Sequence, residues 1–319
     1  MHQYIIKRIL LLIPTLFLVT VIVFTLIRII PGDPALLVLA GPGGEGTFTE
    51  EQLQAMRHKL GTDQPLHIQY ATWIWGLLRG DLGNSIFYDR PVAAQLAEAL
   101  PVTLELTIIG MLLSFLIAVP LGVIAAVKRD TIIDHLASLI TFTGIGVPTF
   151  VVGVLVVYLL VSVFDWLPPL GYADLWQEPL KNLQQMIFPA LVLAFYNLAF
   201  TARVTRSSML EVLWEDYVRT ARSKGLGEPV VIFLHALKNA CLPVVTVSGW
   251  QLARLMGGTV IIETIFLVPG IGRLLVDSIF QRDYPLIQME VLVIAAMILF
   301  VNLIVDITYG LLDPRIRYA

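Results

Sequence analysis

Charged residues are scarce in this sequence. Asp, Glu, Lys and Arg together make up 14% of its 319 residues, whereas a soluble domain of ordinary composition has about 25%. Hydrophobic residues reach 57%. This composition excludes an ordinary soluble protein and predicts an integral membrane protein. The net charge of −3 says little about partners, because in a membrane protein the distribution of charge matters more than its sum.

Several residue patterns that carry chemistry are also missing. Cys241 is the only cysteine, which excludes an intrachain disulfide and a cysteine-rich metal site, and we expect it to be a small packing residue. No G-x-x-x-x-G-K-[ST] run occurs, so no nucleotide-binding loop of that type is expected. No two histidines are four residues apart, so no metal-ligand helix is predicted. We therefore expect no catalytic residue, no metal and no bound cofactor in this chain.

Six apolar stretches are predicted to cross a membrane, whose hydrocarbon core of about 30 Å needs roughly 20 helical residues. They cover about 9–30, 102–127, 132–163, 186–201, 242–266 and 286–312. The third stretch is too long for one straight crossing, and Gly144, Gly146 and Pro148 are expected to let it bend. The predicted fold class is an all-α integral membrane protein with six transmembrane helices.

The basic residues are distributed unevenly between the two sides of these predicted spans. Twelve of the 21 lysines and arginines fall in the short segments that would lie inside. They are Lys7, Arg8, Lys128, Arg129, Arg203, Arg206, Arg219, Arg222, Lys224, Lys238, Arg315 and Arg317. Because lysine and arginine favour cytoplasmic loops, both the N-terminus and the C-terminus are predicted to be cytoplasmic.

The sequence divides into three parts. Residues 1–30 form an N-terminal cytoplasmic end and the first span. Residues 31–98 are predicted to be an extracytoplasmic loop region with short amphipathic helices, one opening at Thr49 and one, at 69–78, lying on the outer leaflet. Residues 99–319 form a five-helix transmembrane core that carries a cytoplasmic hairpin at 207–241.

The polar stretch 215–243, which overlaps this hairpin, predicts two short helices joined by a hinge. Asp216 is placed to N-cap the first helix, Gly225 to occupy its C′ position, and Pro229 to open the second helix at N1. One interpretation is a solvated basic hairpin that lies against anionic headgroups. The other is a surface for a protein partner, and composition alone does not separate the two.

Polar residues within or near the predicted spans are candidates for a translocation pathway, because such residues usually face protein or water. The charged ones are Glu105, Arg254, Glu263 and Asp306, and Asn197 and Asn302 are polar companions. The three acids can instead lie near span ends and pair locally. Arg254 is the deepest, and its guanidinium suits an anionic group such as a peptide carboxylate or an acid of a neighbouring subunit. The predicted pathway residues are Arg254, Asn197, Glu263 and Asn302.

Several motifs, in order along the chain, resemble one family. They are PGDP (Pro31–Pro34), GDLGNS (Gly80–Ser85), PLGVIAA (Pro120–Ala126), EDYVRTARSKGL from Glu215, ETIFLVPGIGRLLVDSIFQRDYP from Glu263, and DPRIR from Asp313. Together they resemble the permease subunits of bacterial ABC importers for dipeptides, oligopeptides and nickel. The resemblance covers essentially the whole chain.

This resemblance implies a type I ABC importer permease fold in the cytoplasmic (inner) membrane and the import of short peptides, with nickel chelates or glutathione as alternative substrates. It implies three kinds of protein partner: a homologous second permease, two ABC ATPases that bind ATP and Mg²⁺, and an extracytoplasmic solute-binding protein. Membrane lipid surrounds the chain, and no nucleic acid is expected. The rival class is an ion-coupled secondary transporter.

The resemblance also gives the hairpin a role. Permeases of ABC importers carry a coupling helix built around Glu-Ala-Ala, three residues, then Gly; Gly225 and Ala221 match that pattern, whereas Arg219 and Thr220 depart from it. The predicted ATPase-coupling residues are Asp216, Tyr217, Ala221, Lys224, Gly225 and Leu226. Tyr217, Ala221 and Lys224 are expected on one helical face, with Leu226 at the turn.

Overall fold

The computed structural model describes residues 2–29, 32–41, 46–169 and 171–312. Among these residues the regular secondary structure is helical, apart from an isolated β-bridge between Asn84 and Pro91, in agreement with the predicted all-α class. Pro31 of the PGDP motif and the closing DPRIR segment, with Arg315 and Arg317, lie outside the described residues.

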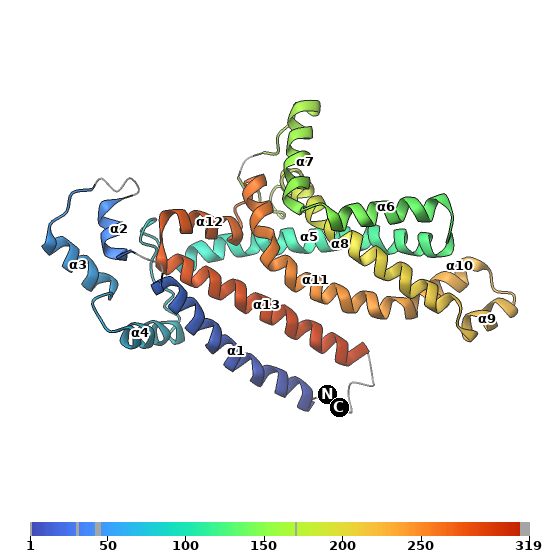
Figure 1. The fold of residues 1–319 in the computed structure, drawn as a ribbon, viewed down its shortest axis with the longest axis horizontal. Helices are drawn as coiled ribbons and strands as arrows, with labels where there is room; N and C mark the ends of the chain where they lie inside the picture. The colour runs from blue at the N-terminus through green and yellow to red at the C-terminus, as the bar shows by residue number, and fades with distance from the viewer. Residues whose placement is uncertain (1, 30–31, 42–45, 170, 313–319) are drawn as a thin grey trace.

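Long helices run side by side along much of the molecule (Figure 1). They are α1 (His2–Ile29), α5 (Val92–Val127), α8 (Pro179–Leu213), α11 (Leu237–Phe266) and α13 (Tyr284–Leu312). In the described part of the chain, five helices are long and apolar enough to cross a membrane, or up to seven if each of two bent pairs is one span. The predicted count of six lies within this range.

The first bent pair lies where the sequence predicted a bend. α6 (Ile132–Gly146) and α7 (Thr149–Phe164) meet at an angle of 105°. Val147 is extended, with φ −92° and ψ 125°, because the residue before a proline is disfavoured in the helical region. Pro148 then precedes the first residue of α7. The break is sharper than the bend predicted within a single span, and it separates two helices.

The second bent pair joins the last two turns of α11, Thr259–Phe266, to α12 (Ile271–Gln281) at 81°. Leu267 ends α11 in the left-handed conformation, with φ 58°. The segment between the predicted stretches 242–266 and 286–312 therefore contains a helix of its own, α12.

Two of the long helices extend well beyond the apolar stretches that predicted them. α5 begins at Val92 rather than near residue 102, and α8 covers Pro179–Leu213 rather than 186–201. Polar residues at these ends continue the helices, whereas hydropathy marks only the apolar parts. The two helices approach closely at Gly122, where an added Cβ would lie 2.6 Å from the Ala202 carbonyl oxygen. Small residues permit such close packing of membrane helices.

Three shorter helices precede the core: α2 (Pro34–Ala40), α3 (Glu50–Leu60) and α4 (Leu66–Leu78). The predicted helix start at Thr49 is confirmed, because the Thr49 hydroxyl and the Gln52 side chain form a reciprocal capping box. α4 packs on α1 through a hydrogen bond of 2.8 Å between Thr20 and Tyr70. Arg28 of α1 also donates a hydrogen bond from its Nε to Gln69 Oε1 of α4, at 2.9 Å.

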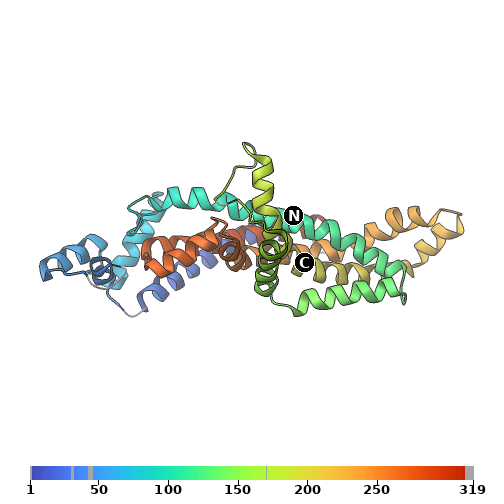
Figure 2. The same cartoon turned by 90° about the horizontal axis from the view of Figure 1, so that it is seen from above.

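The outer helices and the polar hairpin lie far apart. Figures 1 and 2 show α2–α4 at one end of the long axis and the hairpin helices α9 (Asp216–Ser223) and α10 (Glu228–Val230) at the opposite end. The long apolar helices occupy the space between them. This arrangement agrees with the sequence-based placement of the two segments on opposite sides of a membrane.

Candidate functional site

The hairpin consists of α9, a turn, α10 and a π-helical turn, Val231–Ala236, that continues into α11. Gly225 has φ 78° and follows the C-cap Lys224, so the predicted C′ glycine is confirmed. The predicted N-cap is wrong. Glu215 is the extended residue before α9, and Asp216 is the first helical residue, where its carboxylate lies at the positive end of the helix dipole. Pro229 is the second helical residue of α10, after Glu228, rather than the first.

One face of α9 is buried in a small hydrophobic core. Val218 is 0% exposed and Ala221 is 6% exposed. They pack in a cluster with Met209 of α8, Val231 of the π-helical turn and other residues of α5 and α11. The hairpin is therefore fixed to three of the long helices, and a displacement of α9 would be transmitted to them.

The exposed surface of α9 differs from the predicted one. Tyr217 and Leu226 are 41% and 39% exposed, and Lys224 is exposed as well. Ala221 does not share this surface, because it faces the hairpin core. The Tyr217 hydroxyl accepts a hydrogen bond from Asn239 Nδ2 at 2.8 Å, which ties the start of α9 to α11.

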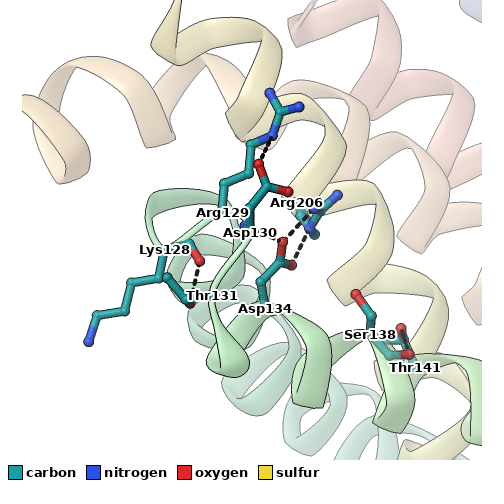
Figure 3. Close-up of polar contacts among 8 residues, drawn as sticks. All are labelled: Lys128, Arg129, Asp130, Thr131, Asp134, Ser138, Thr141 and Arg206. Carbon is teal, nitrogen blue, oxygen red and sulfur yellow. Dashed lines mark hydrogen bonds and ion pairs between the residues drawn. The ribbon is translucent and has the colours of Figure 1, made fainter.

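Arg206, one of the basic residues predicted to lie inside, points toward Asp134 (Figure 3). Its guanidinium donates two hydrogen bonds, of 2.7 and 2.8 Å, to the carboxylate of Asp134 on α6. Asp134 is 3% exposed and also accepts the Asp130 backbone N–H at 3.1 Å. No pattern in the sequence indicated this pair, whose partners are 72 residues apart.

Glu263, a predicted pathway residue, is completely buried and pairs locally. It accepts hydrogen bonds from the Thr103 hydroxyl at 2.8 Å and from the Arg273 backbone N–H at 3.0 Å. The Thr103 oxygen in turn accepts the Ile271 N–H at 2.8 Å. The carboxylate thus caps the N-terminus of α12 and joins it to α5, an arrangement favoured by the dipole of that helix.

The other acids noted in the sequence also have local partners. Glu105 accepts hydrogen bonds from the Tyr172 hydroxyl at 2.5 Å and from Asn182 Nδ2 at 2.6 Å. Burial and the adjacent Glu105 raise the pKa of Tyr172 in the loop between α7 and α8. Asp306 forms an ion pair of 2.7 Å with Arg8, which links α13 to α1.

The remaining predicted pathway residues lie in three different environments. Asn197 is 2% exposed and donates to the Leu193 carbonyl oxygen at 3.2 Å. Arg254 is exposed, and its guanidinium lies over the rings of Tyr196 and Trp250, 5.2 and 5.6 Å from their centroids. Asn302 is exposed and lines a cavity of about 420 Å³ between α1, α11 and α13. Within the described residues, no hydrogen bond or ion pair joins Asn197, Arg254, Glu263 and Asn302 to one another.

Two buried acids were not singled out from the sequence. Asp283, 1% exposed, accepts hydrogen bonds from the Ser85 hydroxyl at 2.5 Å and the Phe87 N–H at 3.1 Å. Glu290 on α13 is 0% exposed and accepts from the Ser278 hydroxyl at 3.2 Å. Ser85 is the last residue of the GDLGNS motif, and Asp283 lies in the QRDYP end of the motif that begins at Glu263. These two motifs were therefore the only sequence features that could have drawn attention to the Ser85–Asp283 hydrogen bond.

Comparison with known proteins gives matches over nearly the whole chain. Residues 118–318 match the family described as binding-protein-dependent transport system inner membrane component, and residues 1–107 match the N-terminal region of such membrane components. A putative peptide transport system permease protein of Brucella abortus is 40% identical over 318 residues, covering 100% of each chain. A glutathione transport system permease protein of Salmonella paratyphi A is 43% identical over 318 residues, also covering 100% of each chain.

A likeness in fold is found in a solved structure as well. One chain in the crystal structure of an amino acid ABC transporter with histidines superposes with a TM-score of 0.50 and 16% sequence identity. The match covers 68% of this chain and 94% of that chain. At this identity the likeness concerns the fold alone.

Proposed function

Since the chain belongs to the family of inner membrane components of binding-protein-dependent transport systems, we propose that it is the permease subunit of an ATP-driven importer of short peptides. The observation that carries this proposal is full-length identity of 40 to 43% to permeases named for peptide and glutathione transport. Glutathione is itself a modified tripeptide, so both names refer to peptide-like substrates. Glutathione and nickel chelates are the alternative substrates of the same machinery.

The proposed topology has six spans, with both termini and the hairpin in the cytoplasm. Residues 1–30 are the N-terminal end and first span, 31–98 the extracytoplasmic region, and 99–319 the five-helix permease core with its hairpin at 207–241. The distribution of lysine and arginine supports this orientation. The position of α2–α4 and α9–α10 at opposite ends of the molecule supports it as well.

The proposed complex contains a homologous second permease, two ABC ATPases and an extracytoplasmic solute-binding protein. The permease contributes no catalytic residue, and ATP and Mg²⁺ bind in the ATPase subunits. Tyr217, Lys224 and Leu226 contact the ATPase through their exposed side chains, and Asp216 lies at the exposed start of α9. Gly225 shapes the turn.

The hairpin core explains how this contact would drive transport. Ala221, which is buried, fixes α9 to α5, α8 and α11 instead of touching the ATPase. When two ATPases close around ATP, α9 moves with them and displaces the ends of these long helices. Their displacement opens the pathway first to one side of the membrane and then to the other.

Arg254 is the proposed pathway residue with the clearest chemistry. Its guanidinium is exposed in the isolated chain, lies over two aromatic rings, and has no ion-pair partner among the described residues. A guanidinium in this position suits the carboxylate of a passing peptide or an acid of the second permease. Asn197, Glu263 and Asn302 complete the proposed set. Glu263 would act through the position of α12, because its carboxylate is buried.

Uptake by the complete importer tests this function. The chain, its second permease, the ATPases and the binding protein are reconstituted in vesicles, and labelled trialanine is added outside with or without ATP inside. Uptake that requires both ATP and the binding protein is expected. Accumulation without ATP, driven by an imposed proton or sodium gradient, would instead establish the ion-coupled class. Uptake of glutathione or a nickel chelate in place of trialanine would identify the substrate as one of the alternatives.

A further inference from the structure

A cavity of about 330 Å³ lies at the outer end of α1, where five segments of the chain meet. Arg28 of α1 borders it, together with the turn between α3 and α4, α4 itself, the loop 81–86 and the first turn of α13. Its volume falls at the lower end of the range of small-molecule sites, about 300–1,000 Å³.

The walls of this cavity are mainly apolar. Ile68 and Trp73 of α4, Leu82 of the loop and Pro285 of α13 line it. A ligand that fits this space therefore needs an apolar part as well as a group that satisfies the polar side chains.

Arg28 is the first of these polar side chains. It is partly buried, its Nε donates to Gln69 at 2.9 Å, and its guanidinium lies over the Phe24 ring at 4.9 Å. Across the described part of the chain no carboxylate is within ion-pair distance of it. A charged side chain removed from water is costly unless an opposite charge or hydrogen bonds compensate it, so the terminal guanidinium nitrogens lack an anionic partner.

Gln288 is a second polar side chain at the cavity with a donor that lacks an acceptor. Its side chain is 95% buried, since its residual exposure is 5%. It borders the same cavity, and its Nε2 has no hydrogen-bond partner among the described residues. A buried amide donor without an acceptor costs about 1–3 kcal/mol, so an acceptor placed in the cavity would remove that penalty.

Asp81, an acid at the rim of the cavity, does not supply the missing partner of Arg28 or Gln288. Asp81 borders the cavity, and its Oδ1 accepts the Gly83 N–H at 2.9 Å within its own turn. The first turn of α13 also borders the cavity at Tyr284 and Pro285, but the Asp283 carboxylate already accepts the Leu286 N–H at 3.3 Å, so the start of this helix has its own acid.

We propose that this cavity binds an oxyanion carried by an amphiphile or a small organic acid, with Arg28 and Gln288 donating to its oxygens. Two sources offer this chemistry: the phosphate of an outer-leaflet phospholipid, and the carboxylate of a short peptide. The apolar walls formed by Ile68, Trp73, Leu82 and Pro285 favour the phospholipid, whose acyl chains would lie against them. Either source would bring together α1, α4 and α13, which surround the cavity.

The test uses the purified full-length chain and two probes, phosphatidylglycerol in detergent micelles and trialanine in the same micelles. Bound lipid is counted by native mass spectrometry, and bound peptide by equilibrium dialysis. Arg28→Gln removes the charge, and Gln288→Leu removes the unpaired donor while leaving the Arg28–Gln69 hydrogen bond in place. Arg79→Gln is the matched control, because Arg79 also lies over an aromatic ring, Trp75 at 4.6 Å, but does not line the cavity.

We expect Arg28→Gln to weaken phosphatidylglycerol binding about tenfold and Gln288→Leu to weaken it several-fold, with Arg79→Gln matching the wild type. The same pattern for trialanine in place of the lipid would identify the oxyanion as a carboxylate. If both cavity variants bind both probes as tightly as Arg79→Gln does, or if neither probe binds the wild type, the proposal is wrong. Because no step depends on ATP or uptake, this outcome is independent of the proposed transport function.

Discussion

Arg206 of α8 and Asp134 of α6 form a two-point ion pair, with N–O distances of 2.7 and 2.8 Å, close to the end of the molecule that carries the hairpin (Figure 3). The carboxylate side chain is 4% exposed and the arginine side chain 32%. The pair is thus largely removed from water and joins α6 to the helix that continues into α9.

Breaking this pair should destabilise the protein. Asp134→Ala leaves the Arg206 charge without a partner, and we expect the free energy of unfolding to fall by about 2–3 kcal/mol, somewhat below the range for fully buried pairs because Arg206 is one-third exposed. Thermal unfolding of the purified chain in detergent measures the change. Arg129→Ala is the control, since the Arg129–Asp130 pair is mostly exposed and should be worth less than about 1 kcal/mol. If the free energy of unfolding falls by the same small amount in Asp134→Ala and Arg129→Ala, the prediction is wrong.

The exposed end of the hairpin allows a direct test of coupling. Leu226→Asp places a charge at the proposed ATPase contact without disturbing the hairpin core, since Leu226 is 39% exposed. We expect ATP-driven uptake to fall at least about tenfold, because an unpaired charge in an apolar contact costs about 2 kcal/mol or more. The melting temperature of the isolated chain should not change.

Val230→Asp serves as the control for this variant. Val230 is apolar and 43% exposed, and it lies in α10 outside 216–226, so uptake should be retained. Ala221→Asp would be a poor test, because Ala221 is buried and a charge there would disrupt the hairpin core itself. Loss of uptake in Val230→Asp but not in Leu226→Asp would place the ATPase contact on α10.

The hydrogen bond between Ser85 and Asp283 is expected to hold segment 83–90 in place. In Asp283→Ala the Ser85 hydroxyl and the Phe87 N–H both lose their acceptor, and a hydrogen bond to a charged group is worth about 1.5–3 kcal/mol. We expect hydrogen exchange of segment 83–90 to become about ten times faster or more. Asp277→Ala is the control, because the ion pair of Asp277 with Arg273 is long, at 3.8 Å, and half exposed on the Asp277 side. Unchanged exchange in Asp283→Ala would show that other contacts hold the segment.

The sequence predicted local features well and long-range contacts poorly. Apolar runs predicted the long helices, Pro148 the break between α6 and α7, and Gly225 the turn of the hairpin, because each depends on the properties of neighbouring residues. The motif-based resemblance to importer permeases is confirmed by the family matches and the full-length relatives.

Contacts between distant residues could not be obtained in the same way. Ser85 and Asp283 are 198 residues apart, and Thr103 and Glu263 are 160 apart. Their pairing depends on how the helices pack, which no local pattern specifies. For the same reason Glu263 looked like an intramembrane pathway residue, although in the structure its carboxylate caps α12. Ala221 likewise was predicted to share a helical face with Tyr217 and Lys224, whereas in the structure it is buried in the cluster that contains Met209.

The cap at Glu263 explains why glycine stands at position 270 in the PGIG part of the motif. A Cβ at Gly270 would lie 2.5 Å from Glu263 Oε2 and 2.5 Å from Thr103 Oγ1, closer than real Cβ contacts allow. Gly270→Ala should therefore displace the carboxylate from the α12 N-terminus and lower the free energy of unfolding by about 2–3 kcal/mol, through overpacking and loss of the cap.

Gly257→Ala provides the matched control for this last prediction. A Cβ at Gly257 meets no atom within 4 Å, and the residue lies within α11, so alanine should be neutral or stabilising by up to about 1 kcal/mol. Thermal unfolding of both variants in the same detergent measures the difference. If Gly270→Ala is as stable as Gly257→Ala, the Glu263 carboxylate does not hold α12. That result would remove the structural role assigned to Glu263 and leave its predicted role in the translocation pathway.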